Sequence, residues 1–97
     1  MALFGLGTTA DASNPFSAKL NAALWTAKAL AEGGTGDLFY TMNKEAVGDD
    51  LGLTLQTGFV TKALVGLFGS DQFRLAVSTD GSTFFDGIIV DNANGII

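Results

Sequence analysis

The second half of the chain alternates short apolar runs with turn residues, and this pattern sets narrow limits on the fold. From Leu51 onward, apolar residues recur at every second position, and Gly, Asn, Asp and Ser separate the runs. Side chains two residues apart point to the same side of a strand. The sequence therefore predicts an all-β fold, an antiparallel meander of short strands built as a sandwich or a barrel-like sheet.

The turn residues divide this meander into short strands, expected at residues 38–42, 51–56, 59–68, 73–78 and 84–90. In the strand expected at 59–68, apolar residues separated by an even number of positions should lie on one face; these are Phe59, Ala63, Val65 and Leu67. Asp-Gly pairs favour type I′ turns, in which two successive residues adopt positive φ. We therefore expect a type I′ hairpin at Asp80-Gly81. The residues expected to be critical for turns are Gly58, Asp80, Gly81, Asn94 and Gly95.

The segment between Phe16 and Glu32 allows two interpretations. Asn14-Pro15 is typical of a helix start, Gly33-Gly34 is typical of a helix end, and the alanine content favours a helix. The alternation of apolar Phe16, Ala18, Leu20 and Ala22 with polar residues instead suits strands. We prefer strands here.

A chain of 97 residues has room for one domain with a thin core. Small scaffolds are usually stabilised by disulfides, a metal or oligomerisation, and this chain has no Cys and no His. A cyclic homo-oligomer is therefore expected. Residues 15–97 are predicted to form a single β module, preceded at 1–14 by an extended arm that docks through Leu3, Phe4 and Leu6.

Charge and residue types argue against several classes of function. The net charge is −5 and the five basic residues are scattered, so nucleic acid is not an expected partner. No apolar run is long enough to span a membrane. Without His or Cys, the chain lacks the base of a Ser/His/Asp site and both partners of a Cys/His site, and the carboxylates fall mostly in predicted turns. We expect no catalytic residue, no metal site and no cofactor.

The aromatic side chains are more numerous than a thin core requires, with eight Phe, one Trp and one Tyr. Adjacent Phe84 and Phe85 should point to opposite faces of a strand, so one of them should leave the core of the monomer. Trp25, Phe84 and Phe85 are therefore candidates for a subunit interface or, alternatively, for stacking against a glycan.

Several blocks of the second half carry a resemblance: Leu55–Gly58, Gly66-Leu67 before Asp71, Phe73–Ser78 before Asp80-Gly81, and Asp91–Gly95. Together, and with residues 38–44, they resemble a family of β-rich tail-fibre and head-spike proteins of phages, prophages and gene transfer agents of alphaproteobacteria. Family members known as fibres are often longer, so a start at Met1 and an end at Ile97 suggest a short base or adaptor.

The resemblance implies a structural virion protein made in the bacterial cytoplasm and placed on the surface of a phage-like particle, where it supports attachment to the host cell. It implies self-association as a trimer, or as a pentamer at a capsid vertex. The implied partners are a capsid or tail protein, and either a host polysaccharide or a distal fibre. The alternative is a carbohydrate-binding module that recognises the host capsule.

Overall fold

The computed structural model describes residues 2–97, and no α-helix occurs among them. The chain divides into two compact units, one ending at Phe39 and the other comprising Tyr40–Ile97. We call them the N-terminal unit and the C-terminal unit. The sequence predicts a division after Asn14, whereas in the N-terminal unit strands on both sides of that position pair with each other.

The N-terminal unit has one short parallel strand pair, β1 (Phe4–Leu6) with β2 (Phe16–Ala18). Phe4 lies opposite Phe16, and their rings stack with centroids 5.4 Å apart. The connecting loop turns at Asp11, whose Oδ1 accepts hydrogen bonds from the backbone N–H groups of Ser13 and Asn14. This is the local turn chemistry that Asp commonly supplies.

Beyond β2, the N-terminal unit corrects both interpretations of the segment that ends at Glu32. Strand structure stops at Ala18, and the one helical turn is a short 3₁₀ helix, η1 (Leu30–Glu32). The chain between them forms neither helix nor strand. A helix in water depends on packing of an apolar face for most of its stability, and this stretch exposes Leu24 and Leu30.

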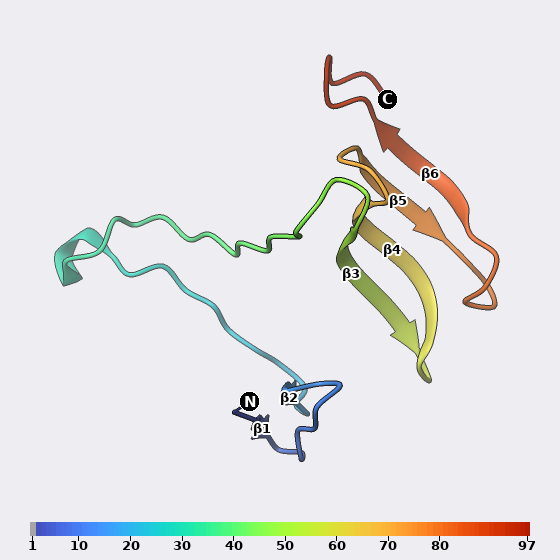
Figure 1. Ribbon diagram of the computed structural model, residues 1–97. Coiled ribbons are helices and arrows are strands. Elements are labelled where there is room, and N and C mark those ends of the chain that lie inside the picture. Colours follow the sequence, from blue (N-terminus) through green and yellow to red (C-terminus); the bar gives the residue numbers. More distant parts are fainter. Residues whose placement is uncertain (1) are drawn as a thin grey trace. The chain divides into compact units, whose positions relative to one another are not determined.

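The C-terminal unit confirms the antiparallel meander. Its strands are β3 (Asp50–Thr57), β4 (Val60–Phe68), β5 (Phe73–Val77) and β6 (Phe85–Val90), in the order β3-β4-β5-β6 within one four-stranded sheet (Figure 1). The strand predicted at 38–42 is wrong: these residues are irregular. Apolar and aromatic residues form a strand only where a neighbouring strand accepts their hydrogen bonds, and neither sheet of the described residues includes this segment.

The hairpin turns differ from the prediction in one respect. Asp80 does not have positive φ, so Asp80-Gly81 is not a type I′ turn, although Gly81 has φ +80°. The two successive positive φ values occur instead at Gly58 (+55°) and Phe59 (+64°), between the paired residues Thr57 and Val60. This is the conformation of a two-residue type I′ hairpin.

Two β-bulges shift the alternation of side chains along the sheet. In β4, Lys62 is the extra residue between Ala63, opposite Leu55, and Thr61, opposite Gln56. In β6, Gly87 is the extra residue between Ile88, opposite Leu75, and Asp86, opposite Ala76. A bulge reverses the parity of the residues beyond it. The predicted grouping of Phe59 with Ala63, Val65 and Leu67 is therefore wrong.

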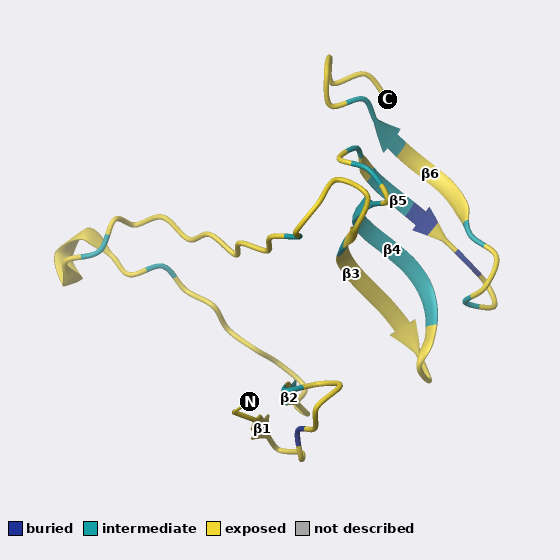
Figure 2. Cartoon of the chain, viewed as in Figure 1, coloured by how far each residue is buried: buried dark blue, intermediate teal, exposed yellow. Residues whose placement is uncertain are grey.

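Very little of the described chain is buried. Ala10 in the N-terminal unit and Ala76 in the C-terminal unit are the buried apolar residues of the described chain, and Ser78 is its buried polar residue. Figure 2 shows β4 at intermediate burial, while most of β3 and β6 is exposed. The sheet is a single layer and has no hydrophobic core of its own.

Candidate functional site

One face of the four-stranded sheet is apolar along every strand. Residues that pair directly across a ladder lie on the same side of the sheet, and the register joins Leu51 to Leu67, Val65 to Leu75, and Val77 to Phe85. We call this side the apolar face. Its apolar residues are Leu51, Leu53, Leu55, Val60, Ala63, Val65, Leu67, Phe73, Leu75, Val77, Phe85, Ile88 and Val90, and polar Thr57 lies on the same face opposite Val60.

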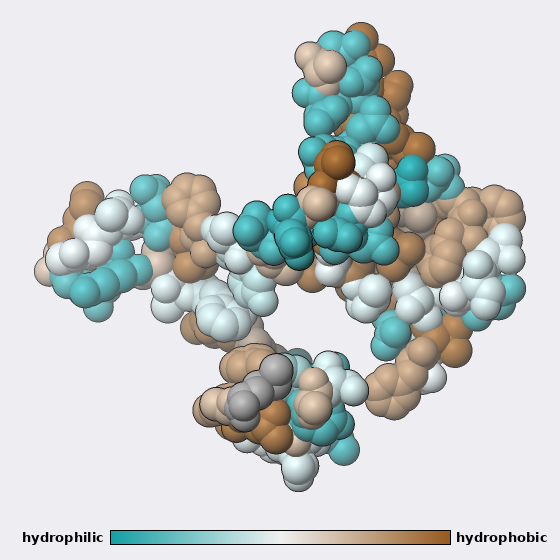
Figure 3. Space-filling model, viewed as in Figure 1, coloured by the Kyte–Doolittle hydropathy of each residue, from teal (hydrophilic) through white to brown (hydrophobic). Residues whose placement is uncertain are grey.

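The apolar face is exposed at about half of its positions, whereas Leu51, Val65, Leu67 and Leu75 are half-buried. Leu53 and Leu55 are each 52% exposed, and Val60, Phe73, Val77, Phe85 and Ile88 are also exposed. In Figure 3, apolar surface is visible over the region of the strands. Isolated exposed apolar side chains are normal, but a contiguous apolar surface marks an interaction site.

The opposite face of the sheet is mixed in character. Gln56 Nε2 donates a hydrogen bond of 3.1 Å to Thr61 Oγ1 across the β3–β4 ladder. Arg74 Nε lies 3.4 Å from Asp86 Oδ1, between β5 and β6. The larger apolar residues on this face, such as Leu64, Phe68 and Ile89, are half-buried. The two faces therefore differ chemically, and the open apolar surface belongs to one of them.

One end of the apolar face borders a hollow of about 330 Å³, lined by Met42–Val47 together with Leu51, Leu67 and Asp71. Lys44 holds the segment 42–47 in place through hydrogen bonds. Its Nζ donates hydrogen bonds to the carbonyl oxygens of Val47 (3.0 Å), Asp49 (2.9 Å) and Ser70 (2.7 Å). The same Nζ lies 3.4 Å from Asp71 Oδ1, and the Lys44 side chain is only 9% exposed.

No local pattern in the sequence indicates this role for Lys44. A single Lys between Asn43 and Glu45 resembles a solvent-exposed charge, and its partners come partly from the β4–β5 loop, more than twenty residues away in the chain. The three carbonyl partners occupy the three donor positions of an ammonium group. Lys44 therefore serves as a structural clamp and has no hydrogen left for a ligand.

Phe59 is the second residue that sequence reasoning missed as a special position. It lies at the tip of the β3–β4 hairpin, is 94% exposed, and has φ +64°. Positive φ is uncommon for residues other than Gly, and for a bulky side chain it marks strain. The dipeptide Gly58-Phe59 lies between two alternating runs, which is the position of a two-residue hairpin turn. Phe is not a residue that type I′ turns favour, so the sequence does not predict this turn type.

The residues predicted for the docking arm lie within the N-terminal unit. Phe4 and Leu6 belong to β1 and Leu3 directly precedes it, and all three side chains are exposed. They share one small sheet with β2. Their use in docking stays a prediction.

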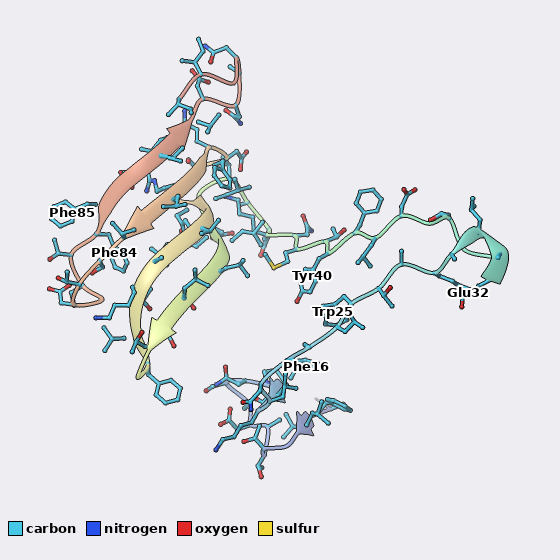
Figure 4. The ribbon with its side chains drawn as sticks, turned by 180° about the vertical axis from the view of Figure 1, so that it is seen from behind. Phe16, Trp25, Glu32, Tyr40, Phe84 and Phe85 are labelled. Atoms are coloured by element: carbon cyan, nitrogen blue, oxygen red, sulfur yellow. The ribbon has the colours of Figure 1, made fainter. Side chains whose placement is uncertain are left out.

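The predicted interface aromatics do not form one cluster. Trp25 lies in the irregular segment of the N-terminal unit and is 64% exposed. Phe84 immediately precedes β6 and is half-buried, whereas Phe85 begins β6 on the apolar face and is 68% exposed. The rings of Phe84 and Phe85 point in different directions (Figure 4). Of these three residues, the structure therefore places Phe85 on the apolar face.

The predicted turn residues occupy hydrogen-bonded turns. Asp80 Oδ1 accepts hydrogen bonds from the backbone N–H groups of Thr83 and Ser82 and from Ser78 Oγ. These bonds lower the pKa of Asp80, the bond from Thr83 contributing most. Asn94 Oδ1 accepts from the N–H of Ile96, and Gly58 and Gly95 both have positive φ. Asp80 therefore acts as a turn acceptor.

The described residues contain no group of three or more acidic, His or Cys side chains that could hold a metal ion. None of the helical structure in residues 2–97 is long and apolar enough to cross a membrane. Comparison with protein-family models, with curated proteins and with solved structures found no match. The apolar face is therefore the feature of the described residues that indicates a binding surface.

Proposed function

We propose that this protein is a non-enzymatic structural subunit of a phage-like particle, serving as a head spike or as the base or adaptor of a fibre, and that it works as a homo-oligomer. The observation that carries the proposal is the open apolar face on a sheet without a core. An apolar surface of this kind is costly to leave in water and is stabilised when another protein covers it.

The polar groups of the sheet support a structural role. Lys44 clamps a loop, Asp80 accepts hydrogen bonds from its own turn, and Arg74 pairs with Asp86. Each of these groups is used to hold the fold. The family resemblance of residues 55–95 supports a location on a virion surface that takes part in attachment to the host.

The carbohydrate-binding alternative receives no comparable support. A sugar-stacking platform needs flat rings that share one surface. Phe84 and Phe85 differ in direction and burial, and Phe85 belongs to a face that is otherwise aliphatic over most of its area. We therefore propose the structural role alone.

The test of this proposal uses particles from cells that encode the chain. Density-purified particles should contain the chain in a fixed copy number by quantitative mass spectrometry, and deleting the gene should reduce adsorption to host cells without reducing DNA packaging. Particles that lack the chain, or a deletion mutant with normal adsorption, would contradict the proposed role.

A further inference from the structure

We infer that the Lys44 ammonium group occupies a preformed cation-binding site, and that this site binds a free alkylammonium ion when the Lys44 side chain is shortened. The site lies within the C-terminal unit, and the inference does not rest on the proposed virion role. The class of ligand is a monovalent cation that carries N–H donors, with propylammonium as the best fit.

The first argument is the set of oxygen atoms around Lys44 Nζ. The carbonyl oxygens of Val47, Asp49 and Ser70 lie 3.0, 2.9 and 2.7 Å from it, and Asp71 Oδ1 lies at 3.4 Å. We call these four atoms the oxygen cage. The three carbonyl distances are those of N–H···O hydrogen bonds, one for each hydrogen of an ammonium group. The cage therefore has the shape that an ammonium group requires.

The second argument is that the walls of the oxygen cage have hydrogen bonds of their own. The N–H of Ala46 donates to Asp49 Oδ2 (3.1 Å), and the N–H of Asp49 donates back to the carbonyl oxygen of Ala46 (3.1 Å). In the β4–β5 loop, the N–H of Gln72 donates to Ser70 Oγ (3.2 Å). None of these three bonds involves Lys44. The carbonyl groups are therefore held near their positions when the Lys44 side chain is removed.

The third argument is the charge and size of the oxygen cage. Three of its oxygens belong to neutral carbonyl groups, so the Asp71 carboxylate supplies its one negative charge. Ca²⁺ takes about six to eight oxygens at about 2.3–2.6 Å, and Mg²⁺ requires about 2.0–2.1 Å. The four oxygens of the cage all lie at 2.7 Å or more from Nζ. The cage therefore suits a monovalent ammonium ion better than either divalent cation.

The fourth argument is the space that a shortened side chain would leave. The Lys44 side chain is only 9% exposed, so its hydrocarbon stem is enclosed. Lys44→Ala removes three methylene groups and the ammonium group, which together match a propylammonium ion. A cavity left by a truncated side chain can bind a small molecule of matching shape. The hollow that borders Lys44, Leu51 and Leu67 gives such an ion an entrance with apolar walls.

Binding of the free ion follows from the state of the oxygen cage in Lys44→Ala. Three carbonyl oxygens and a carboxylate oxygen then face one another without the donors that they share in the native chain. Polar groups left unpaired in an enclosed site are unfavourable. An ion that restores the N–H donors binds the folded form and therefore stabilises it against unfolding.

Urea denaturation of the full-length Lys44→Ala chain, followed by far-UV circular dichroism, tests the inference. The urea midpoint of this variant should lie below that of the wild type. Propylammonium chloride should recover half or more of the difference, and ethylammonium and methylammonium chloride progressively less. Tetramethylammonium chloride has the same charge but no N–H donor. At equal ionic strength, it and sodium chloride should recover none of the difference.

Two variants serve as matched controls. Lys44→Met removes the ammonium group but keeps a long side chain in the channel, so propylammonium cannot enter and should not raise its urea midpoint. Lys28→Ala removes the same atoms as Lys44→Ala from an exposed position in the N-terminal unit, and its midpoint should not respond either. The wild type, in which the oxygen cage is already filled, should also show no response.

A measurement on the wild-type chain covers the case in which Lys44→Ala does not fold. In proton–nitrogen NMR spectra, the ammonium hydrogens of Lys44 should exchange with water far more slowly than those of Lys28, because each is held by an oxygen of the cage. Three results would overturn the inference: recovery by propylammonium no greater than that by sodium chloride, an equal rise in Lys44→Met, or exchange at Lys44 as fast as at Lys28.

Discussion

The two units of this chain are built from similar residues but hold their structure in very different ways. In the N-terminal unit, a parallel pair of three-residue strands and one stacked Phe pair are followed by an irregular stretch that exposes its Leu and Trp side chains. In the C-terminal unit, the four strands are joined by antiparallel ladders, two of which contain a bulge.

The difference shows that apolar content alone does not make regular structure. Antiparallel strands joined by short turns bring their hydrogen-bonding groups together at low cost in loop entropy. The parallel pair must instead span the loop between Leu6 and Phe16 for only three paired positions. We therefore expect perturbations in the C-terminal unit to change the unfolding transition of the sheet, and perturbations in the N-terminal unit to leave it nearly unchanged.

The largest effect is expected from Lys44→Met. This change keeps much of the side-chain volume but removes the ammonium group, leaving three carbonyl oxygens and Asp71 without their partner. The loss should lower the free energy of unfolding by about 2–3 kcal/mol. Urea denaturation followed by far-UV circular dichroism, at one fixed protein concentration, measures it.

Lys28→Met serves as the control for Lys44, since Lys28 is exposed in the N-terminal unit. It should change the free energy of unfolding by less than about 0.5 kcal/mol, as is usual for surface sites. Equal effects of the two substitutions would show that the clamp contributes nothing.

The next effect concerns Gly81→Val. Gly81 has φ +80°, and an added Cβ would lie 3.1 Å from Val60 Cγ1. A β-branched residue should therefore lower the free energy of unfolding by about 1–3 kcal/mol. Gly36→Val is the comparison in the N-terminal unit: Gly36 has φ +79° with no atom near the added Cβ, and its effect on the sheet transition should be absent. Similar urea midpoints for wild type and Gly81→Val would contradict this account of the turn.

A change of opposite sign is expected at Phe59. Asn tolerates the left-handed conformation better than Phe does, so Phe59→Asn should raise the free energy of unfolding by about 0.5–1 kcal/mol. Phe39→Asn, at an exposed position in the N-terminal unit, should have no such effect. If Phe59→Asn instead destabilises the sheet, the exposed ring contributes to packing in the assembled protein.

The smallest effect on stability is expected from deleting residues 2–12. The deletion removes β1 and the Phe4–Phe16 stack, both confined to the N-terminal unit. The sheet transition should shift by less than about 0.5 kcal/mol, while the truncated protein should be lost from purified particles. Normal incorporation of the truncated chain would show that docking does not depend on Leu3, Phe4 and Leu6.

The four strands of the C-terminal unit were predictable because alternation and turn residues are local signals. Leu51, Leu53 and Leu55 lie on one face as their spacing indicates, and the boundaries of β4, β5 and β6 fall within one residue of those predicted. The segment 38–42 failed because its β-forming residues describe a preference, whereas a strand exists only where another strand pairs with it.

The candidate site was only partly visible in the sequence. Alternation predicted an apolar side to each strand, but the bulges at Lys62 and Gly87 decide that Val60 and Ile88 join the same face. The role of Lys44 depends on carbonyl oxygens of residues distant in the chain, and the strain at Phe59 depends on which dipeptide forms the tight turn.

The sequence by itself determined the all-β character, the antiparallel order of β3 to β6, and the absence of Cys and His. Each of these follows from local spacing or from composition. Tertiary structure alone decided which residues share the apolar face and that the Lys44 side chain is largely enclosed by its partners. These features depend on register and on contacts between distant segments, and a local pattern of residues does not specify them.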